Sequence, residues 1–108
     1  MLLESVWPGG IDVPTQDGQD RRLVACGERF EVEGASGARL VAIGRAVAVG
    51  PDGSTATARV RYTGLRQEGL IDLPKLRKRV EYNAVVSVPL WAANQLVSEQ
   101  PADWRKEV

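Results

Sequence analysis

The side chains that carry most enzyme chemistry are nearly absent from this chain. Among its 108 residues there is no histidine and there is one cysteine, Cys26. A Ser-His or Cys-His pair therefore cannot form, and the commonest general base at neutral pH is missing. One cysteine without histidine also excludes a structural zinc site, which takes its ligands from Cys and His. We expect no enzyme activity, no metal site and no cofactor.

Carboxylates remain as possible acids, bases or cation ligands. Glu28, Glu31 and Glu33 lie close together, but the last two alternate with Phe30 and Val32, as the solvated face of a strand does. Nothing in their spacing is typical of a calcium loop or a glycosidase pair. We interpret them as solvent-exposed, and a small ligand-binding module or an enzyme that works without histidine stays open as an alternative.

Positive side chains gather at one place in the second half of the chain. The cluster comprises Lys75, Arg77, Lys78 and Arg79. Arg59 and Arg61 would join it as nucleic-acid contacts, because concentrated cations bind phosphates and release counterions. The net charge of zero and the few aromatic residues favour instead a solvated face or a contact to an acidic protein. Nucleic-acid binding is thus possible but not favoured.

Two of the three tryptophans lie where burial is not the obvious reason for them. Trp7 falls in a turn-rich stretch and Trp104 in a charged tail, whereas Trp91 belongs to the apolar stripe of an expected helix. Aromatic side chains are enriched at protein interfaces. We therefore predict an interface built from Trp7, Trp104, Lys75, Arg77, Lys78 and Arg79.

Charge is divided unequally along the sequence. Residues 1–54 carry five arginines and eight carboxylates, and residues 55–108 carry nine Lys or Arg and six carboxylates, so the net charges are −3 and +3. This asymmetry is consistent with copies that stack head to tail, although charges scattered over one folded surface would give the same count.

Length and composition indicate a single globular domain over residues 1–108. With 44% hydrophobic and 26% charged residues, the chain has the usage of an ordinary folded protein. No apolar run approaches the ~18 residues of a membrane span, and the first residues do not read as a secretory signal. We expect a protein made in the cytoplasm, without membrane contact.

Turn residues divide the chain into short extended segments. Alternating apolar and polar residues and flanking Gly and Pro predict strands over residues 2–6, 22–26, 29–32, 46–49, 55–63 and 80–88. The turns at 27–28 and at 50–53 would close two hairpins. The conformation of residues 65–79 stays open.

Two helices are expected between those strands. Ser36 would cap a two-turn helix that ends at Gly44, where a left-handed residue is favoured. Pro89 would lie in the first turn of a C-terminal helix that runs to Glu99, with Ser87 as its cap.

The remaining segments, 7–20 and 101–108, are expected to form an exposed loop or arm and a tail. The predicted fold class is α+β, mainly β, with a small antiparallel sheet or barrel, a short internal helix and a C-terminal helix. No internal repeat is evident in the sequence.

One stretch resembles a known class of small proteins. The segments Gly27 to Val32 and Ala38 to Val49 contain a strand ending F-x-V, a short helix A-x-L-V-x-x-G and another strand. This pattern resembles small modules of tailed-phage and prophage structural gene clusters. The resemblance implies a protein near the capsid, of the decoration, head-completion or head-tail joining type, and brings no catalytic residues with it.

The function expected from these observations is structural. We expect a non-enzymatic phage virion or morphogenesis protein that stabilises a capsid or a head-tail connector through contacts with other virion proteins or with itself. It would be assembled in the bacterial cytoplasm and reside in the virion. The alternatives are a small nucleic-acid-binding β-barrel that uses residues 75–79, and the ligand-binding module or histidine-free enzyme named above.

Overall fold

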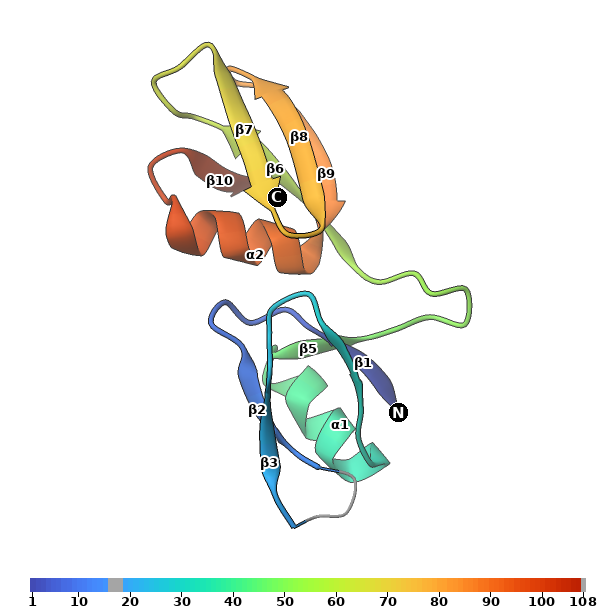
Figure 1. Ribbon diagram of the computed structural model, residues 1–108. Helices are drawn as coiled ribbons and strands as arrows, with labels where there is room; N and C mark the ends of the chain where they lie inside the picture. The colour runs from blue at the N-terminus through green and yellow to red at the C-terminus, as the bar shows by residue number, and fades with distance from the viewer. Residues whose placement is uncertain (16–18, 108) are drawn as a thin grey trace. The chain divides into compact units, whose positions relative to one another are not determined.

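A computed structural model describes residues 1–15 and 19–107 of the chain (Figure 1). The chain divides into two compact units, unit 1 (Met1–Ala56) and unit 2 (Thr57–Val108), instead of the single domain expected from its length. The net charge changes from −3 to +3 at this same boundary, because Thr55 and Ala56 carry no charge. The charge asymmetry along the sequence is therefore a difference between two units.

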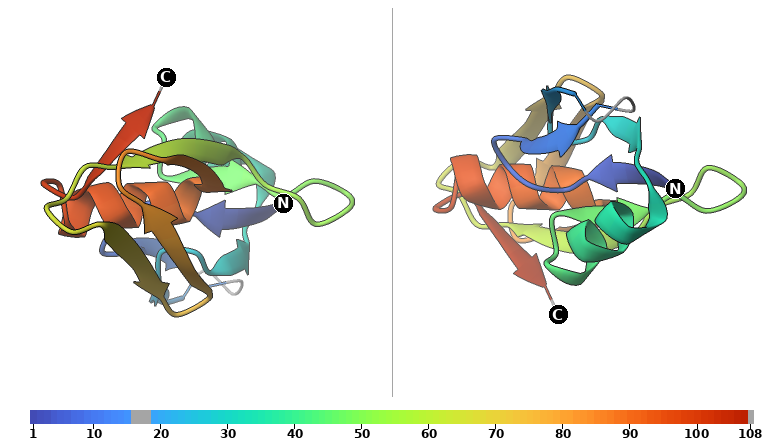
Figure 2. Two further views of the ribbon diagram at one scale, coloured as in Figure 1. Left: turned by 90° about the horizontal axis from the view of Figure 1, so that it is seen from above. Right: turned by 90° about the horizontal axis from the view of Figure 1, so that it is seen from below.

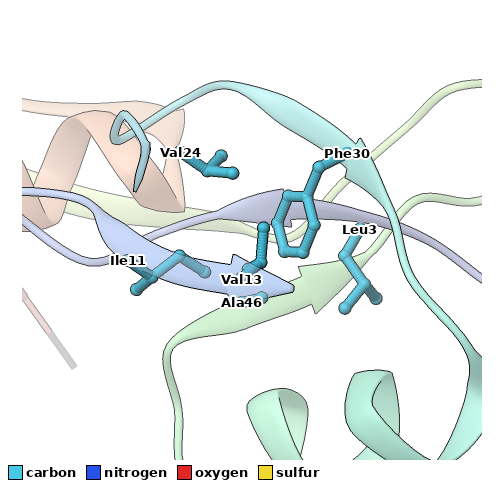
Figure 3. Close-up of a cluster of buried hydrophobic side chains, with 6 residues drawn as sticks. All are labelled: Leu3, Ile11, Val13, Val24, Phe30 and Ala46. Atoms are coloured by element: carbon cyan, nitrogen blue, oxygen red, sulfur yellow. The ribbon is translucent and has the colours of Figure 1, made fainter. Parts of the chain in front are cut away.

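Unit 1 is built from short antiparallel strands and a helix. Its elements in chain order are β1 (Leu2–Ser5), β2 (Ile11–Pro14), β3 (Arg21–Val24), β4 (Arg29–Glu31), α1 (Gly34–Ala42) and β5 (Ala46–Ala48). β1 lies between β4 and β5 and is antiparallel to both, while β2 pairs with β3. The core is a cluster of buried apolar side chains shown in Figure 3: Leu3, Ile11, Val13, Val24, Phe30 and Ala46.

Unit 2 has the same kinds of element. They are β6 (Thr57–Tyr62), β7 (Glu68–Leu73), β8 (Leu76–Glu81), β9 (Val85–Pro89), α2 (Leu90–Glu99) and β10 (Trp104–Glu107). β6 lies between β9 and β10, and β7 pairs with β8. α2 packs against the three-stranded sheet (Figure 2). The buried apolar residues of the unit include Val60, Tyr62, Ile71, Val80, Trp91, Leu96 and Trp104.

Unit 2 repeats the topology of unit 1. In each unit four strands are followed by a helix and a fifth strand, and the first strand lies between the fourth and the fifth. The second and third strands form a separate antiparallel pair in both units. The structure therefore contains an internal repeat that was not evident in the sequence.

Strand register and turn hydrogen bonds show which residues are equivalent. The N–H of Gly27 donates to the carbonyl of Ser5 at 2.8 Å, and the N–H of Asn83 donates to the carbonyl of Tyr62 at 2.9 Å. Both turn residues are in the left-handed region, with φ of 88° and 65°. Each helix begins the same number of residues later. The match extends through the turn, the fourth strand and the start of the helix.

The fold class predicted from the sequence is confirmed. The protein is α+β and mainly β, with small antiparallel sheets, a short internal helix and a C-terminal helix. The sheets are open, with edge strands on both sides of β1 and β6, and do not close into a barrel.

The predicted arm and tail are both corrected. Residues 7–20 contain β2, whose alternate residues Ile11 and Val13 are buried, although residues 16–18 of that stretch lie outside the described part. Residues 101–107 contain β10, which completes the sheet of unit 2, and Val108 of the predicted tail lies outside the described residues. Ile11 and Val13 alternate with Asp12, which is a strand signal that the sequence interpretation missed, whereas the sequence Trp104-Arg105-Lys106-Glu107 of β10 has no such alternation.

Both predicted hairpins are wrong because the strands pair across longer separations. β3 pairs with β2, and β4 pairs with β1, so the turn at 27–28 connects two different sheets. β5 and β6 belong to different units. In unit 1, β3 takes the preceding strand β2 as its partner, and β4 and β5 both pair with the distant strand β1.

The helix ends differ slightly from those expected. α1 begins at Gly34 instead of after a Ser36 cap, and its N-cap Glu33 makes no side-chain capping hydrogen bond. Gly44 has the predicted positive φ, at 78°. α2 begins at Leu90 with Pro89 as its N-cap, so Ser87 is not the cap.

Candidate functional site

The predicted basic cluster lies on the β7–β8 hairpin, where carboxylates stand between its cations. Arg77 Nε donates to Asp72 Oδ1 at 2.9 Å across the hairpin. Arg79 Nη1 lies 3.9 Å from Glu68 Oε2 on the same face. These exposed pairs place negative charge beside each arginine, so this face of the hairpin is of mixed sign.

The two lysines of the cluster do not share that face. Lys75 is in the turn between β7 and β8, and Lys78 lies opposite Ile71 on the other face of the hairpin. The hairpin therefore does not form the continuous positive surface that binding to a phosphate backbone uses.

Arg59 and Arg61 lie on the outer face of the three-stranded sheet of unit 2. Arg61 forms an ion pair with Glu107, and its Nη1 donates to the carbonyl of Asn83 at 2.7 Å. The hydrogen bond from Arg61 holds the pKa of the Glu107 carboxyl below its usual range. Arg61 thus joins β6 to β10 and to the turn before β9, which accounts for it without a ligand.

Trp104 is a core residue, which corrects its predicted place in an interface. Its side chain is 1% exposed, and its ring centroid lies 5.2 Å from that of Tyr62. The indole Nε1 donates to Gln100 Oε1 at 3.2 Å, so its polar atom has a partner as well. Trp91 is buried too, as predicted from its helical stripe.

Trp7 remains accessible, in agreement with its predicted place in a loop. Its side chain is 41% exposed, and the guanidinium carbon of Arg45 stacks over its ring at 4.5 Å from the centroid. This cation-π contact holds Arg45, which also lines the groove described next.

A groove of about 580 Å³ opens in unit 1 between the β2–β3 pair and α1. We call it the unit-1 groove. Its apolar lining includes Leu23, Leu40 and Ile43, and its positive lining includes Arg21, Arg39 and Arg45. Asp12 is the one carboxylate among the described lining residues. The combination of exposed apolar side chains and arginines is typical of protein-binding surfaces.

Because unit 2 repeats the topology of unit 1, the residues of the unit-1 groove can be compared with the equivalent residues of unit 2. Leu23 is 64% exposed and Ile43 is 54% exposed. Strand register makes Leu23 equivalent to Arg79 of unit 2, because each lies one residue before a buried valine of the third strand. Counting from the helix start makes Ile43 equivalent to Glu99. The same fold therefore accepts charged residues at both positions, so folding does not explain the exposed apolar pair.

The two helices differ in the same way. α2 buries Trp91, Ala92, Ala93 and Leu96, whereas the buried residue of α1 is Gly37. Yet α1 has a largely apolar sequence, and Val41 beside the groove is 41% exposed. Unit 1 thus leaves apolar side chains of α1 in contact with solvent. Exposed apolar patches of this kind mark interaction sites.

Unit 2 has its own groove, which overlaps the equivalent place in part: Glu68, Gly69, Leu70 and Asp103 correspond to Gly10, Ile11, Asp12 and Arg45, but its described lining includes no residue of α2. It encloses about 380 Å³ and is lined in part by Tyr62, Leu65, Glu68, Leu70 and Asp103. Its charged lining is Arg66 with two carboxylates, so its balance of charge is opposite to that of the unit-1 groove. This chain therefore presents two related grooves with rims of opposite sign.

Residues 1–15 and 19–107 contain no group of three Cys, Asp or Glu side chains close enough together to hold a metal ion. In the same residues, neither helix has the length and apolar character needed to cross a membrane. No family model, curated protein or solved structure matches this chain.

The groove was not predicted from the sequence, although a signal was present. Leu23 and Val24 are consecutive in an expected strand, so one of them must face away from the core. Leu40, Val41 and Ile43 likewise cover more of a helix than one buried stripe needs. Apolar residues on both sides of an element are the pattern to look for.

Proposed function

We propose that this protein is a non-enzymatic structural component of a tailed phage, which stabilises a capsid or a head-tail connector through protein-protein contacts. The observation that carries the proposal is the unit-1 groove. It exposes Leu23 and Ile43 beside arginines, at positions where the sister unit has Arg79 and Glu99. Folding does not require these two positions to be apolar, so contact with a protein partner best explains their exposed apolar side chains.

The phage assignment rests on the resemblance of residues 27–49 to small phage structural modules. The repeat supports it, because unit 2 has the same order of strand, helix and strand. Val86-Ser87-Val88 and Leu96-Val97 also stand where the pattern has F-x-V and L-V. A module used twice in one short chain fits a protein that connects neighbours in an assembly.

Binding to nucleic acid is the weaker proposal on the same evidence. Asp72 and Glu68 lie beside Arg77 and Arg79, and Arg61 is paired with Glu107. Interleaved carboxylates reduce the attraction of these cations for phosphate.

The proposal is tested on particles from bacteria that carry the gene. We expect mass spectrometry of gradient-purified particles to find the protein at a constant ratio to the major capsid protein. The double variant Leu23→Arg/Ile43→Glu should be recovered in particles at least ~10-fold less well, because each change replaces apolar contact area by charge. Leu2→Arg, an exposed apolar-to-charged change on β1 outside the groove lining, is the matched control. A wild-type protein absent from particles would refute the proposal.

A further inference from the structure

We infer that the occupant of the unit-1 groove is unit 2 of a second copy of this chain. The inference rests on the proposed function in one respect, since both assign the groove to protein contacts. It goes further by naming the partner and the surface that enters the groove. That surface consists of the loop between β6 and β7 and the rim of the unit-2 groove, with Leu65, Leu70, Glu68 and Asp103.

The apolar parts of the two surfaces match. Leu65 is fully exposed in the β6–β7 loop, and Leu70 is 56% exposed on β7. Both line the unit-2 groove, just as Leu23 and Ile43 line the unit-1 groove. Each unit therefore presents a pair of large aliphatic side chains to solvent beside its groove, and contact between the two pairs would remove all four from water.

The charges around these apolar residues are complementary. The unit-1 groove has three arginines and one carboxylate in its described lining, and the unit-2 groove has two carboxylates and one arginine. Opposite charges around an apolar centre favour one orientation of docking and raise the association rate. The net charges of the units, −3 and +3, add a long-range attraction between unlike units of different copies and repulsion between like units.

One pair of equivalent positions shows the complementarity most directly. The N–H of Val6 donates to the carbonyl of Arg45 at 3.1 Å, and the N–H of Thr63 donates to the carbonyl of Asp103 at 2.7 Å. These bonds connect the first strand to the turn before the fifth strand in each unit. Arg45 and Asp103 thus occupy the same site of the repeat, with opposite charge, at the rim of each groove.

Contact between unlike units of two copies has a defined consequence for assembly. Every copy offers one unit-1 groove and one unit-2 surface. Two copies can satisfy both contacts reciprocally in a closed dimer, and successive copies can satisfy them in a chain. Either product depends on protein concentration and weakens as salt screens the opposite rims.

The test is self-association of the full chain measured by sedimentation velocity over a wide concentration range at low salt. We expect the wild type to form dimers or longer chains. Leu23→Arg/Ile43→Glu should weaken association by at least ~100-fold, because two aliphatic side chains leave the contact. Both replacements are the residues that unit 2 has at these positions, so the variant should keep its unfolding temperature. Leu2→Arg, which lies outside the lining of both grooves, is the matched control and should associate as the wild type does.

Charge reversal then distinguishes this partner from any other. Arg45→Glu and Asp103→Arg, made singly, should each weaken association by ~10-fold or more, since one rim then repels the other. The variant with both changes should recover association, because the two rims again have opposite signs. Circular dichroism melts confirm that each variant is folded.

Three results would overturn the inference: a wild type that is monomeric at every concentration, association that the groove variant leaves intact, or a double charge reversal no better than either single change. A monomer that still enters phage particles overturns the inference alone. A protein that self-associates as expected but is absent from particles overturns the proposed phage function alone.

Discussion

Units 1 and 2 have the same strand order and register, but they fill their interiors in opposite ways. At three equivalent positions a small side chain in one unit stands where the other has a large one: Ser5 and Tyr62, Ala46 and Trp104, Gly69 and Ile11. In unit 2 the first and fifth strands contribute large aromatic side chains to the core, and the second strand has a glycine. In unit 1 the first and fifth strands contribute small side chains, and the second strand contributes the large Ile11.

The exchange shows that a large side chain at one core position is accommodated by a small one at a neighbouring position. A Cβ atom on Gly69 would overlap the ring of Tyr62, so unit 2 has room for the aromatic ring only because this residue is glycine. Protein interiors are close-packed, and a large side chain at one position demands a small one at its neighbour. One backbone topology therefore accepts two different sets of core residues.

The largest effect that this comparison predicts is the loss of Trp104. Trp104→Ala should destabilise unit 2 by about 4 kcal/mol, because it empties the centre of that core and leaves Gln100 Oε1 without its indole donor. Hydrogen exchange should show loss of protection in β6, β9 and β10, while the ladder of β1, β4 and β5 in unit 1 stays protected. Trp104→Phe is the matched control and should lose much less. If Trp104→Ala were as stable as the wild type, Trp104 would not be a core residue.

A second prediction exchanges the packing of the two units. Gly69→Ile places in unit 2 the residue that unit 1 has at Ile11, and should cost about 3 kcal/mol through overlap with Tyr62. Adding Tyr62→Ser, the residue of unit 1 at Ser5, removes the ring and should recover about half of that loss. Urea unfolding of both variants and of Tyr62→Ser alone measures the coupling. Strictly additive costs would mean that the two positions do not share space.

The fold was predictable from the sequence where side chains alternate over a whole strand. β6 was predicted because Val60 and Tyr62 alternate with Arg59 and Arg61, and the structure confirms it. β7 was left open because its first buried position is Gly69, which has no apolar side chain to reveal the alternation. Packing against Tyr62, and not hydrophobicity, sets the residue there.

A predicted strand over residues 80–88 is in fact the end of β8, a turn and β9. Apolar residues continue the two-residue period across the turn, and Asn83 with its positive φ was the sign of the break. The repeat stayed hidden for a related reason. Equivalent core positions carry unlike residues, and loops of unequal length change the sequence separation between equivalents along the chain.

The candidate site was less predictable than the fold. Of the predicted interface residues, Trp7 is exposed, Trp104 is buried, and the cations of residues 75–79 are divided between a turn and the two faces of a hairpin. A charge count does not show which carboxylates a hairpin will bring beside its cations. The exposed apolar pair Leu23 and Ile43 became informative only when unit 2 supplied charged residues at the equivalent places.

A third, smaller effect concerns the turn before the fourth strand. Gly27 and Asn83 hold the same left-handed conformation, with φ of 88° and 65°. Gly27→Ala and Asn83→Ala should each cost about 1 kcal/mol, because alanine is strained at positive φ. Asn83→Gly should cost less, since glycine adopts this conformation freely and only the contact to Arg61 is lost. Thermal unfolding of the three variants compares them, and an unaffected Asn83→Ala would contradict the equivalence of the two turns.

The smallest predicted effect is a difference in how the two units hold a carboxylate. Hydrogen bonds from Ser54 lower the pKa of Asp52 in unit 1 below 3.8, and the hydrogen bond from Arg61 lowers the pKa of Glu107 in unit 2 below 4.5. A lowered pKa in the folded protein stabilises it above the unfolded pKa, and this contribution is lost as the pH falls through the folded value. NMR titration of the side-chain carboxyl carbons should show both pKa values below the ordinary ones.

Added salt should raise the pKa of Glu107 and hardly change that of Asp52, because salt screens the charge of Arg61 but not a hydrogen bond from a neutral hydroxyl. Glu107→Gln should remove its share of the acid sensitivity of unit 2, and equal responses of both groups to salt would show that Arg61 does not act through its charge.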